Sequence, residues 1–228
     1  MTKSSKDRPH DIREEREAEE KIPLSFSLQW PIMKLNQAMG DVVDGYKKMF
    51  KIGPSDLKDL YRKRYEAAEH KGETWKSIRW MEKVTSMDPE DPDGFYLLGI
   101  AYEKNKDLEA ATRAYNRVIE IKPDHVKAYY RTGLLCLGRR EFKKAVELFE
   151  KAIKLEPDSA ELNFRLGVAY DRLQKHEKAV SHFSEAVKIQ PDFLKVYKNM
   201  ALTYDSMGKH KEALECLKRA LELEESAA

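Results

Sequence analysis

Residues 126–159 read VKAYYRTGLLCLGRREFKKAVELFEKAIKLEPDS, and residues 160–193 read AELNFRLGVAYDRLQKHEKAVSHFSEAVKIQPDF. The two stretches have the same length and align from end to end without a gap, and both carry a Pro-Asp pair near their end. Prolines recur with this same period at Pro89, Pro123, Pro157 and Pro191. Because proline cannot continue a helix and restrains the residue before it, each proline marks a helix end. The period predicts five successive units, 58–91, 92–125, 126–159, 160–193 and 194–228, the last of which includes a C-terminal cap.

Small residues recur where the two helices of each predicted unit would touch. The eighth position holds Gly99, Gly133, Gly167 and Ala201. The twentieth position holds Ala111, Ala145, Ala179 and Ala213. The twenty-fourth position instead carries a large side chain that we expect to fill the space between helices, namely Met81, Tyr115, Phe149, Phe183 and Leu217.

This pattern resembles the tetratricopeptide-repeat (TPR) family, and the resemblance covers 170 of the 228 residues. It implies an all-α fold, a TPR solenoid in which helix-turn-helix units stack into a right-handed superhelix. Unit 58–91 departs from the family pattern, because Arg64, Tyr65 and Ser77 stand where leucine, glycine and alanine are typical. We therefore expect an irregular first repeat followed by four regular ones.

Two different segments precede the repeats. Residues 1–21 carry 13 charged residues and almost nothing to bury, which predicts a disordered tail. Within 22–57, apolar residues at spacings of three and four over 32–52 predict an amphipathic helix that acts as an N-terminal half-repeat. Just before it, large apolar residues alternate with polar ones, a period of two that indicates an extended segment. These residues are Leu24, Phe26, Leu28 and Trp30. They either cap the first repeat of their own chain or dock on another molecule.

The composition argues against several classes of function. The 42 basic and 40 acidic residues leave a net charge of +2 with the signs interleaved, so no basic stripe predicts nucleic-acid binding. The start of the chain lacks the apolar core of a signal peptide, and no apolar run is long enough to cross a bilayer. Cys136 and Cys216 are expected to be core residues, and the histidines to be solvated. We found no metal-ligand spacing, phosphate loop or catalytic set, which predicts a non-enzyme without cofactor or metal.

The TPR resemblance implies that the first helix of each unit lines a concave groove. Most side chains at the groove-facing positions of the central units are apolar or aromatic, and an exposed apolar surface of this kind usually marks a binding site. The expected peptide groove consists of Tyr96, Ile100, Tyr130, Leu134, Leu137, Phe164 and Val168. Asparagine is missing from the ninth position of every unit, so the clamp by which some TPR proteins grip the acidic tails of chaperones is absent. The alternative is that these side chains are buried within one chain.

A set of charges is expected to link the irregular first unit to the second. Arg62 and Lys63 should face Asp91 and Asp93 and help to set the angle between two subdomains. Because such a pairing would be exposed, we expect it to contribute only about 0–1 kcal/mol.

Four stretches show a closer resemblance, to the magnetosome-associated TPR proteins of magnetotactic bacteria. They are AMGDVVDGYKKMF (38–50), SDLKDLYRKRYEAAEHKGE (55–73), GFYLLGIAYEKN (94–105) and NFRLGVAYDRLQKHEKAVSHF (163–183). The resemblance implies a cytoplasmic scaffold, peripheral on the cytosolic face of the magnetosome membrane, that supports magnetosome formation. Its implied partners are further copies of itself, as a homo-oligomer, and magnetosome membrane proteins. The alternative is a monomeric TPR adaptor that binds an apolar or amphipathic peptide of another protein in its groove.

Overall fold

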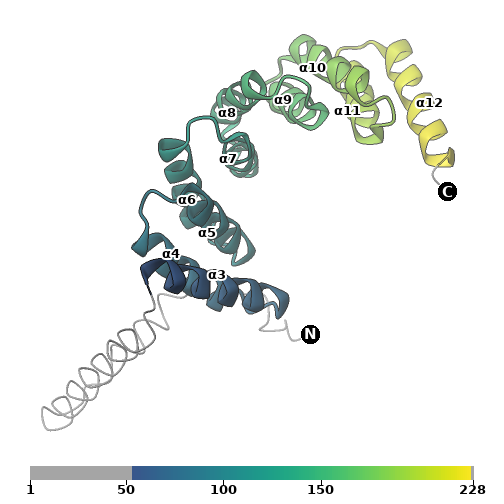
Figure 1. The fold of residues 1–228 in the computed structure, drawn as a ribbon. Coiled ribbons are helices and arrows are strands. Elements are labelled where there is room, and N and C mark those ends of the chain that lie inside the picture. Colours follow the sequence, from purple (N-terminus) through teal and green to yellow (C-terminus); the bar gives the residue numbers. More distant parts are fainter. Residues whose placement is uncertain (1–52, 227–228) are drawn as a thin grey trace, which may run out of the picture. The chain divides into compact units, whose positions relative to one another are not determined.

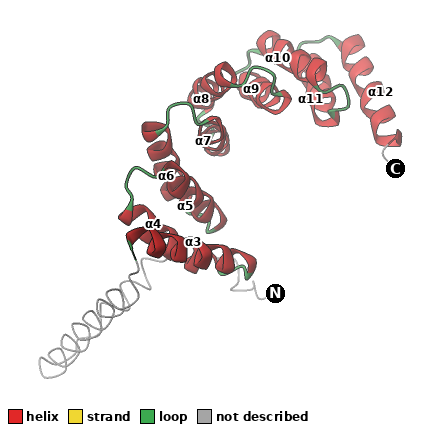
Figure 2. Ribbon diagram, in the orientation of Figure 1, coloured by secondary structure: helices red, strands yellow, loops and turns green. Residues whose placement is uncertain are grey.

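The computed structural model describes residues 53–226, which form ten helices and contain no strand (Figures 1 and 2). This confirms the predicted all-α fold class. The predicted tail at 1–21, the apolar segment with Trp30 and the predicted helix at 32–52 lie outside the described residues.

The contacts divide the chain into two compact units, Met1–Ala114 (unit 1) and Tyr115–Ala228 (unit 2). The helices that lie wholly in unit 1 are α3 (Pro54–His70), α4 (Thr74–Met87) and α5 (Pro92–Lys104). Helix α6 (Leu108–Ile121) contains the boundary between the units. Unit 2 continues with α7 (Val126–Gly138), α8 (Phe142–Leu155), α9 (Ala160–Arg172), α10 (His176–Ile189), α11 (Leu194–Ser206) and α12 (His210–Ser226).

Consecutive helices pack as helix-turn-helix pairs, α3 with α4 in unit 1, and α7 with α8, α9 with α10 and α11 with α12 in unit 2. The second helix of a pair also contacts the first helix of the next pair, as α4 contacts α5, α8 contacts α9 and α10 contacts α11. We call the first helix of a pair helix A and the second helix B. Each helix is therefore packed mainly against its neighbours in sequence, as in other repeat proteins.

Helix ends recur at the positions that the sequence period predicts. Helices α4, α6, α8 and α10 each end two residues before one of the periodic prolines. In every repeat, the turn from helix A to helix B contains one residue in the left-handed region, with φ between 59° and 73°. Such a residue lets the chain leave one helix and start the next. The five residues are Gly72, Lys106, Arg140, Gln174 and Gly208.

Glycine at the eighth position allows helix A to approach helix B. A Cβ atom added to Gly133 would lie 2.5 Å from the Phe149 ring, and one added to Gly167 would lie 2.6 Å from the Phe183 ring. Both distances are far below van der Waals contact, so a side chain at either position would displace the aromatic ring. The rings in turn are fully buried.

The large side chains at the twenty-fourth position form the centre of the core, as predicted, in four of the five repeats. Met81 in unit 1 and Tyr115, Phe149 and Phe183 in unit 2 are all 0% exposed. Leu217 in α12 is different, with 46% of its surface exposed, because the described residues cover mainly the α11 side of α12. Cys136 and Cys216 are buried free cysteines, which confirms their expected place in the core.

Tyrosines on helix A also bond to the preceding helix B. The Tyr102 hydroxyl donates to Glu82 at 2.8 Å in unit 1, and the Tyr170 hydroxyl donates to Glu150 at 2.5 Å in unit 2. The two pairs occupy equivalent positions in their repeats, so the same polar link recurs at two inter-repeat contacts.

Candidate protein-binding surface

The helix-A surface of unit 2 contains four of the predicted groove residues. Tyr130, Leu134 and Leu137 on α7 and Val168 on α9 are each half-buried, and all four pack against the unit-2 core with one side. Leu202 on the neighbouring helix α11 is 68% exposed. Because α9 contacts α11, the surface continues along the row of helices A. We call these five residues the helix-A surface.

Phe164, a predicted groove residue, belongs to the core instead. Its side chain is only 4% exposed, and its ring centroid lies 6.0 Å from that of Phe183 and 5.3 Å from that of Phe193. Phe193 comes from the loop before α11. The Phe193 ring therefore helps to shield Phe164 from solvent. Phe164 is consequently not part of the surface that a partner would contact.

A polar network that the sequence analysis did not identify links α7 to α9 beside this surface. The Tyr130 hydroxyl donates to Glu161 Oε1 at 2.9 Å, and Arg165 Nε donates to the same oxygen at 2.6 Å. Burial and the hydrogen bond to Glu161 raise the pKa of Tyr130, so the hydroxyl remains a donor at neutral pH. The spacing of four residues between Glu161 and Arg165 is the sequence signal that could have revealed this pair. The network connects the Tyr130 hydroxyl of α7 to two side chains of α9.

The two predicted groove residues of unit 1, Tyr96 and Ile100, are half-buried on α5. They are four residues apart and so lie on one face of that helix.

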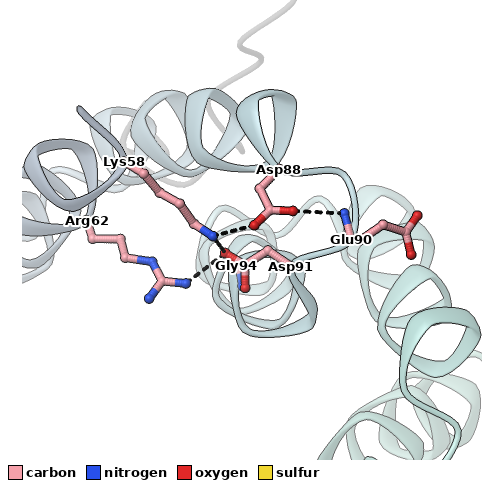
Figure 3. Close-up of polar contacts among 6 residues, drawn as sticks. All are labelled: Lys58, Arg62, Asp88, Glu90, Asp91 and Gly94. Atoms are coloured by element: carbon pink, nitrogen blue, oxygen red, sulfur yellow. Dashed lines mark hydrogen bonds and ion pairs between the residues drawn. The ribbon is translucent and has the colours of Figure 1, made fainter. Parts of the chain in front are cut away.

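A charge cluster joins α3 to the loop between α4 and α5 in unit 1 (Figure 3). The Lys58 ammonium lies 2.6 Å from Asp88 Oδ2 and 2.9 Å from Asp91 Oδ2. The Arg62 guanidinium lies 2.7 Å from Asp91 Oδ2, while Asp91 Oδ1 accepts the backbone N–H of Gly94 at 3.1 Å and so caps α5. Asp91 is only 7% exposed. Its burial alone would raise its pKa, but the bonds from Lys58, Gly94 and Arg62 together lower it.

The predicted link between Arg62 and Asp91 is therefore present, but Lys63 and Asp93 are wrong members of the set. Within residues 53–226, neither Lys63 nor Asp93 forms an ion pair, and both are exposed. Lys58 and Asp88 take their places. The reason for the lysine is helical geometry, since Lys58 and Arg62 are one turn apart on the same face of α3, whereas Lys63 points about 100° away from Arg62.

Three histidines, His125, His176 and His182, are half-buried and so less solvated than the sequence suggested. The His182 ring stacks on Tyr170 with centroids 5.5 Å apart, and its Nδ1 lies 3.2 Å from the amide oxygen of the buried Asn163. Burial lowers the pKa of His182, which makes it a neutral packing group. The described residues contain no group of three metal-ligating side chains, and none of their helices is long and apolar enough to cross a membrane.

Family profiles of the tetratricopeptide repeat match residues 92–125, 130–192 and 194–226, which together make up more than half of the chain. No curated protein matches the chain by sequence. Among solved structures, 438 chains match, so the repeat fold itself is widespread.

Several of these structures are of a protein named MamA. MamA MSR-1 is 32% identical, with a TM-score of 0.66 over 75% of this chain and 98% of that chain. MamA AMB-1 is also 32% identical, with a TM-score of 0.65 over 75% of this chain and 93% of that chain. MamA from Desulfovibrio magneticus RS-1 is 27% identical, with a TM-score of 0.72 over 75% of this chain and 97% of that chain.

The chain therefore belongs to the tetratricopeptide-repeat family, whose members are non-enzymatic protein-interaction modules. Its likeness to these structures in both sequence and fold makes it a MamA-like member of that family.

Proposed function

We propose that this protein is a self-assembling scaffold that coats the magnetosome vesicle through partner proteins and so supports magnetosome formation. The coarser part of this function, a scaffold for protein–protein interaction, follows from the family. The magnetosome role, the location on the cytosolic face of its membrane and the membrane-protein partners rest on the resemblance to magnetosome-associated TPR proteins.

The observation that carries self-assembly is the helix-A surface of unit 2. It presents half-buried apolar side chains and one largely exposed leucine, Leu202, in a row. The same sequence contains an apolar segment, Leu24 to Trp30, that needs a surface to cover it. A contact between these two different regions on successive copies is head-to-tail, so it propagates into rings or open assemblies instead of closing as a dimer.

The first test of this proposal is the particle size of the full chain against protein concentration. Light scattering or sedimentation should detect particles much larger than the 26.6 kDa chain. A single species of that mass at all concentrations would contradict self-assembly.

Two substitutions test the contact from its two sides. Trp30→Ala removes an aromatic anchor, and such anchors typically contribute about 2 kcal/mol, so each contact should weaken by roughly 30-fold. Leu202→Glu places a charge on the helix-A surface at the side chain that packs least against the core, so the fold should be retained. The matched control is Leu155→Glu, because Leu155 is an exposed leucine of helix α8, a helix B. If the control disrupts assembly as strongly as Leu202→Glu, the effect is not specific to the helix-A surface.

The alternative function is a monomeric adaptor that binds an apolar or amphipathic peptide of another protein on the same helix-A surface. The observation that favours it is the network of Tyr130, Glu161 and Arg165, which places polar groups beside the apolar row. Apolar ligand sites commonly contain a few polar groups that orient the ligand. The two functions predict different particle sizes for the full chain, because an adaptor is a monomer at all concentrations whereas a scaffold assembles.

A further inference from the structure

Unit 1 contains a hollow of about 610 Å³ between α4 and α5. One wall is a single face of α4, which presents Arg79, Lys83 and Ser86 at spacings of four and three residues. The opposite wall comes from α5 and consists of Leu98 and Tyr102. This hollow contains none of the residues of the helix-A surface and is independent of the proposed function.

The cations beside this hollow have no carboxylate partner among residues 53–226. Arg79 and Lys83 line it, and Arg64 on α3 is close enough to influence Lys83. Within residues 53–226, none of the three forms an ion pair, whereas Lys58 and Arg62 in the same unit are both paired with aspartates. Like charges four residues apart on a helix, such as Arg79 and Lys83, destabilise it.

Aromatic rings hold two of these cations in place. The Lys83 ammonium lies 4.9 Å from the centroid of Trp80 and 5.1 Å from that of Tyr61, and the two rings are stacked. The Arg64 guanidinium lies 4.9 Å from the Trp80 centroid. Cation–π contacts position a cation but do not neutralise its charge. Burial, Arg79 and Arg64 lower the pKa of Lys83.

The other polar groups of the hollow include one further donor, the Ser86 hydroxyl, and one carboxylate, that of Glu82. The Ser86 hydroxyl now donates to the backbone carbonyl of Lys83 at 2.8 Å and can rotate to donate into the hollow. Glu82 also lines the hollow, but its Oε1 accepts the Tyr102 hydroxyl at 2.8 Å. That hydrogen bond holds the Glu82 carboxylate toward the α5 wall.

We propose that the hollow between α4 and α5 binds a phosphate-class dianion, held by Arg79 and Lys83 with the Ser86 hydroxyl as a further donor. The three cations Arg79, Lys83 and Arg64 exceed the one carboxylate of the hollow, that of Glu82, by two charges. This excess matches the two negative charges of a phosphate-class group, whereas a carboxylate ligand would neutralise only one of them. Both inorganic phosphate and a phosphate monoester present this chemistry, and the experiment below distinguishes the two.

The test is calorimetric titration of the full chain with inorganic phosphate at constant ionic strength. Saturable binding is expected, and Arg79→Gln and Lys83→Gln should each weaken it by about tenfold, the loss of one charge-assisted hydrogen bond. Lys83→Arg should largely restore binding, because it keeps the charge. The matched control is Lys63→Gln, which removes an exposed lysine of the same unit. Lys63 has no ion pair among the described residues, so this variant should change the affinity by less than about twofold. Circular dichroism checks that every variant stays folded.

A second readout follows the Lys83 side chain by NMR. Saturating phosphate should raise the pKa of Lys83, because a bound anion stabilises the charged ammonium. Titration with glycerol phosphate tests whether the site accepts a phosphate monoester. If glycerol phosphate binds as tightly as inorganic phosphate, the site accepts esterified phosphate. If only inorganic phosphate binds, the ligand is the free ion. The proposal is overturned if acetate binds as tightly as phosphate, if Lys63→Gln weakens binding as much as the other two variants, or if the pKa of Lys83 does not move.

Discussion

Gly133 lies so close to Phe149 that the hydrogen of glycine is the only substituent that fits. We expect Gly133→Leu to destabilise the protein by about 3 kcal/mol or more, because the added side chain overlaps a buried ring and overpacking strains the surrounding helices. Thermal unfolding followed by circular dichroism measures the effect. The matched control is Gly138→Leu at the end of the same helix, where nothing lies within 4 Å of an added Cβ. The control should be close to neutral, and equal melting temperatures for the two variants would contradict the assigned repeat register.

The residues with positive φ in the turns between helices A and B recur at one repeat position but are not all of one residue type. Gly72 and Gly208 adopt a positive φ at no steric penalty, but Lys106, Arg140 and Gln174 adopt it at a penalty of about 1 kcal/mol each. The repeat period therefore predicts where the turn falls, while the glycine signal alone would have found only two of the five turns.

At the scale of helices, the charge cluster around Asp91 fastens α3 to the start of α5. We expect Asp91→Asn to lower the free energy of unfolding by about 1–2 kcal/mol, because asparagine keeps the helix cap but loses the ion pairs with Lys58 and Arg62. Asp93→Asn is the matched control, since Asp93 is exposed and, among the described residues, forms no ion pair. It should change stability by less than about 0.5 kcal/mol. Urea denaturation measures the free energy of unfolding of both variants. If the two variants lower it equally, the ion pairs of Asp91 do not stabilise the contact between α3 and α5.

The Asp91 contribution should also depend on pH. The pKa of Asp91 in the folded protein is below its ordinary value of 3.8, so folding favours the ionised form. The stabilisation is therefore complete above pH 3.8 and is lost as the pH falls through the folded pKa. The stability difference between the wild type and Asp91→Asn should shrink over that acid range, whereas a constant difference would show that the charge of Asp91 is not involved.

The Tyr170–Glu150 bond makes the corresponding prediction at alkaline pH. Burial and the bond to Glu150 raise the pKa of Tyr170 from 10.0 to about 12, so the folded protein keeps the hydroxyl protonated after the unfolded chain has lost its proton. Its stabilisation is complete below pH 10.0 and falls as the pH rises toward about 12. We expect Tyr170→Phe to lower stability by about 1.5 kcal/mol at pH 7, the value of a hydrogen bond to a charged acceptor. Denaturation at several pH values should find this difference narrowing above pH 10.0, and a pH-independent difference would exclude Tyr170 as its source.

At the scale of the whole molecule, the proposed assembly joins the N-terminal segment of one copy to unit 2 of another. A chain that starts at Ile32 lacks Leu24, Phe26, Leu28 and Trp30 but keeps the predicted amphipathic helix and every described helix. Size-exclusion chromatography should find it as a monomer under conditions in which the full chain is a large particle. Its helices should melt as in the full chain, because the repeats pack mainly against their sequence neighbours. An unchanged particle size would place self-association elsewhere in the molecule.

The sequence by itself was enough to determine the repeat architecture of this protein. The period of the prolines, the small residues at two fixed positions and the large side chains at a third predicted the helix ends, the close contacts and the centre of the core. These features can be read from the sequence because the regular repeats pack their helices in the same way, with similar residue types at the same spacing.

Only the tertiary structure decided which side chains meet across helices and which ones remain exposed. Phe164 is buried because Phe193, from the loop that precedes α11, packs against its ring. Lys58 pairs with Asp91 because the loop after α4 brings that carboxylate to one face of α3. Within residues 53–226, Arg79 and Lys83 form no ion pair, and the Glu82 carboxylate beside them accepts the Tyr102 hydroxyl instead. Such contacts depend on the angle and distance between helices, and a hydrophobic period specifies only the face that each helix buries.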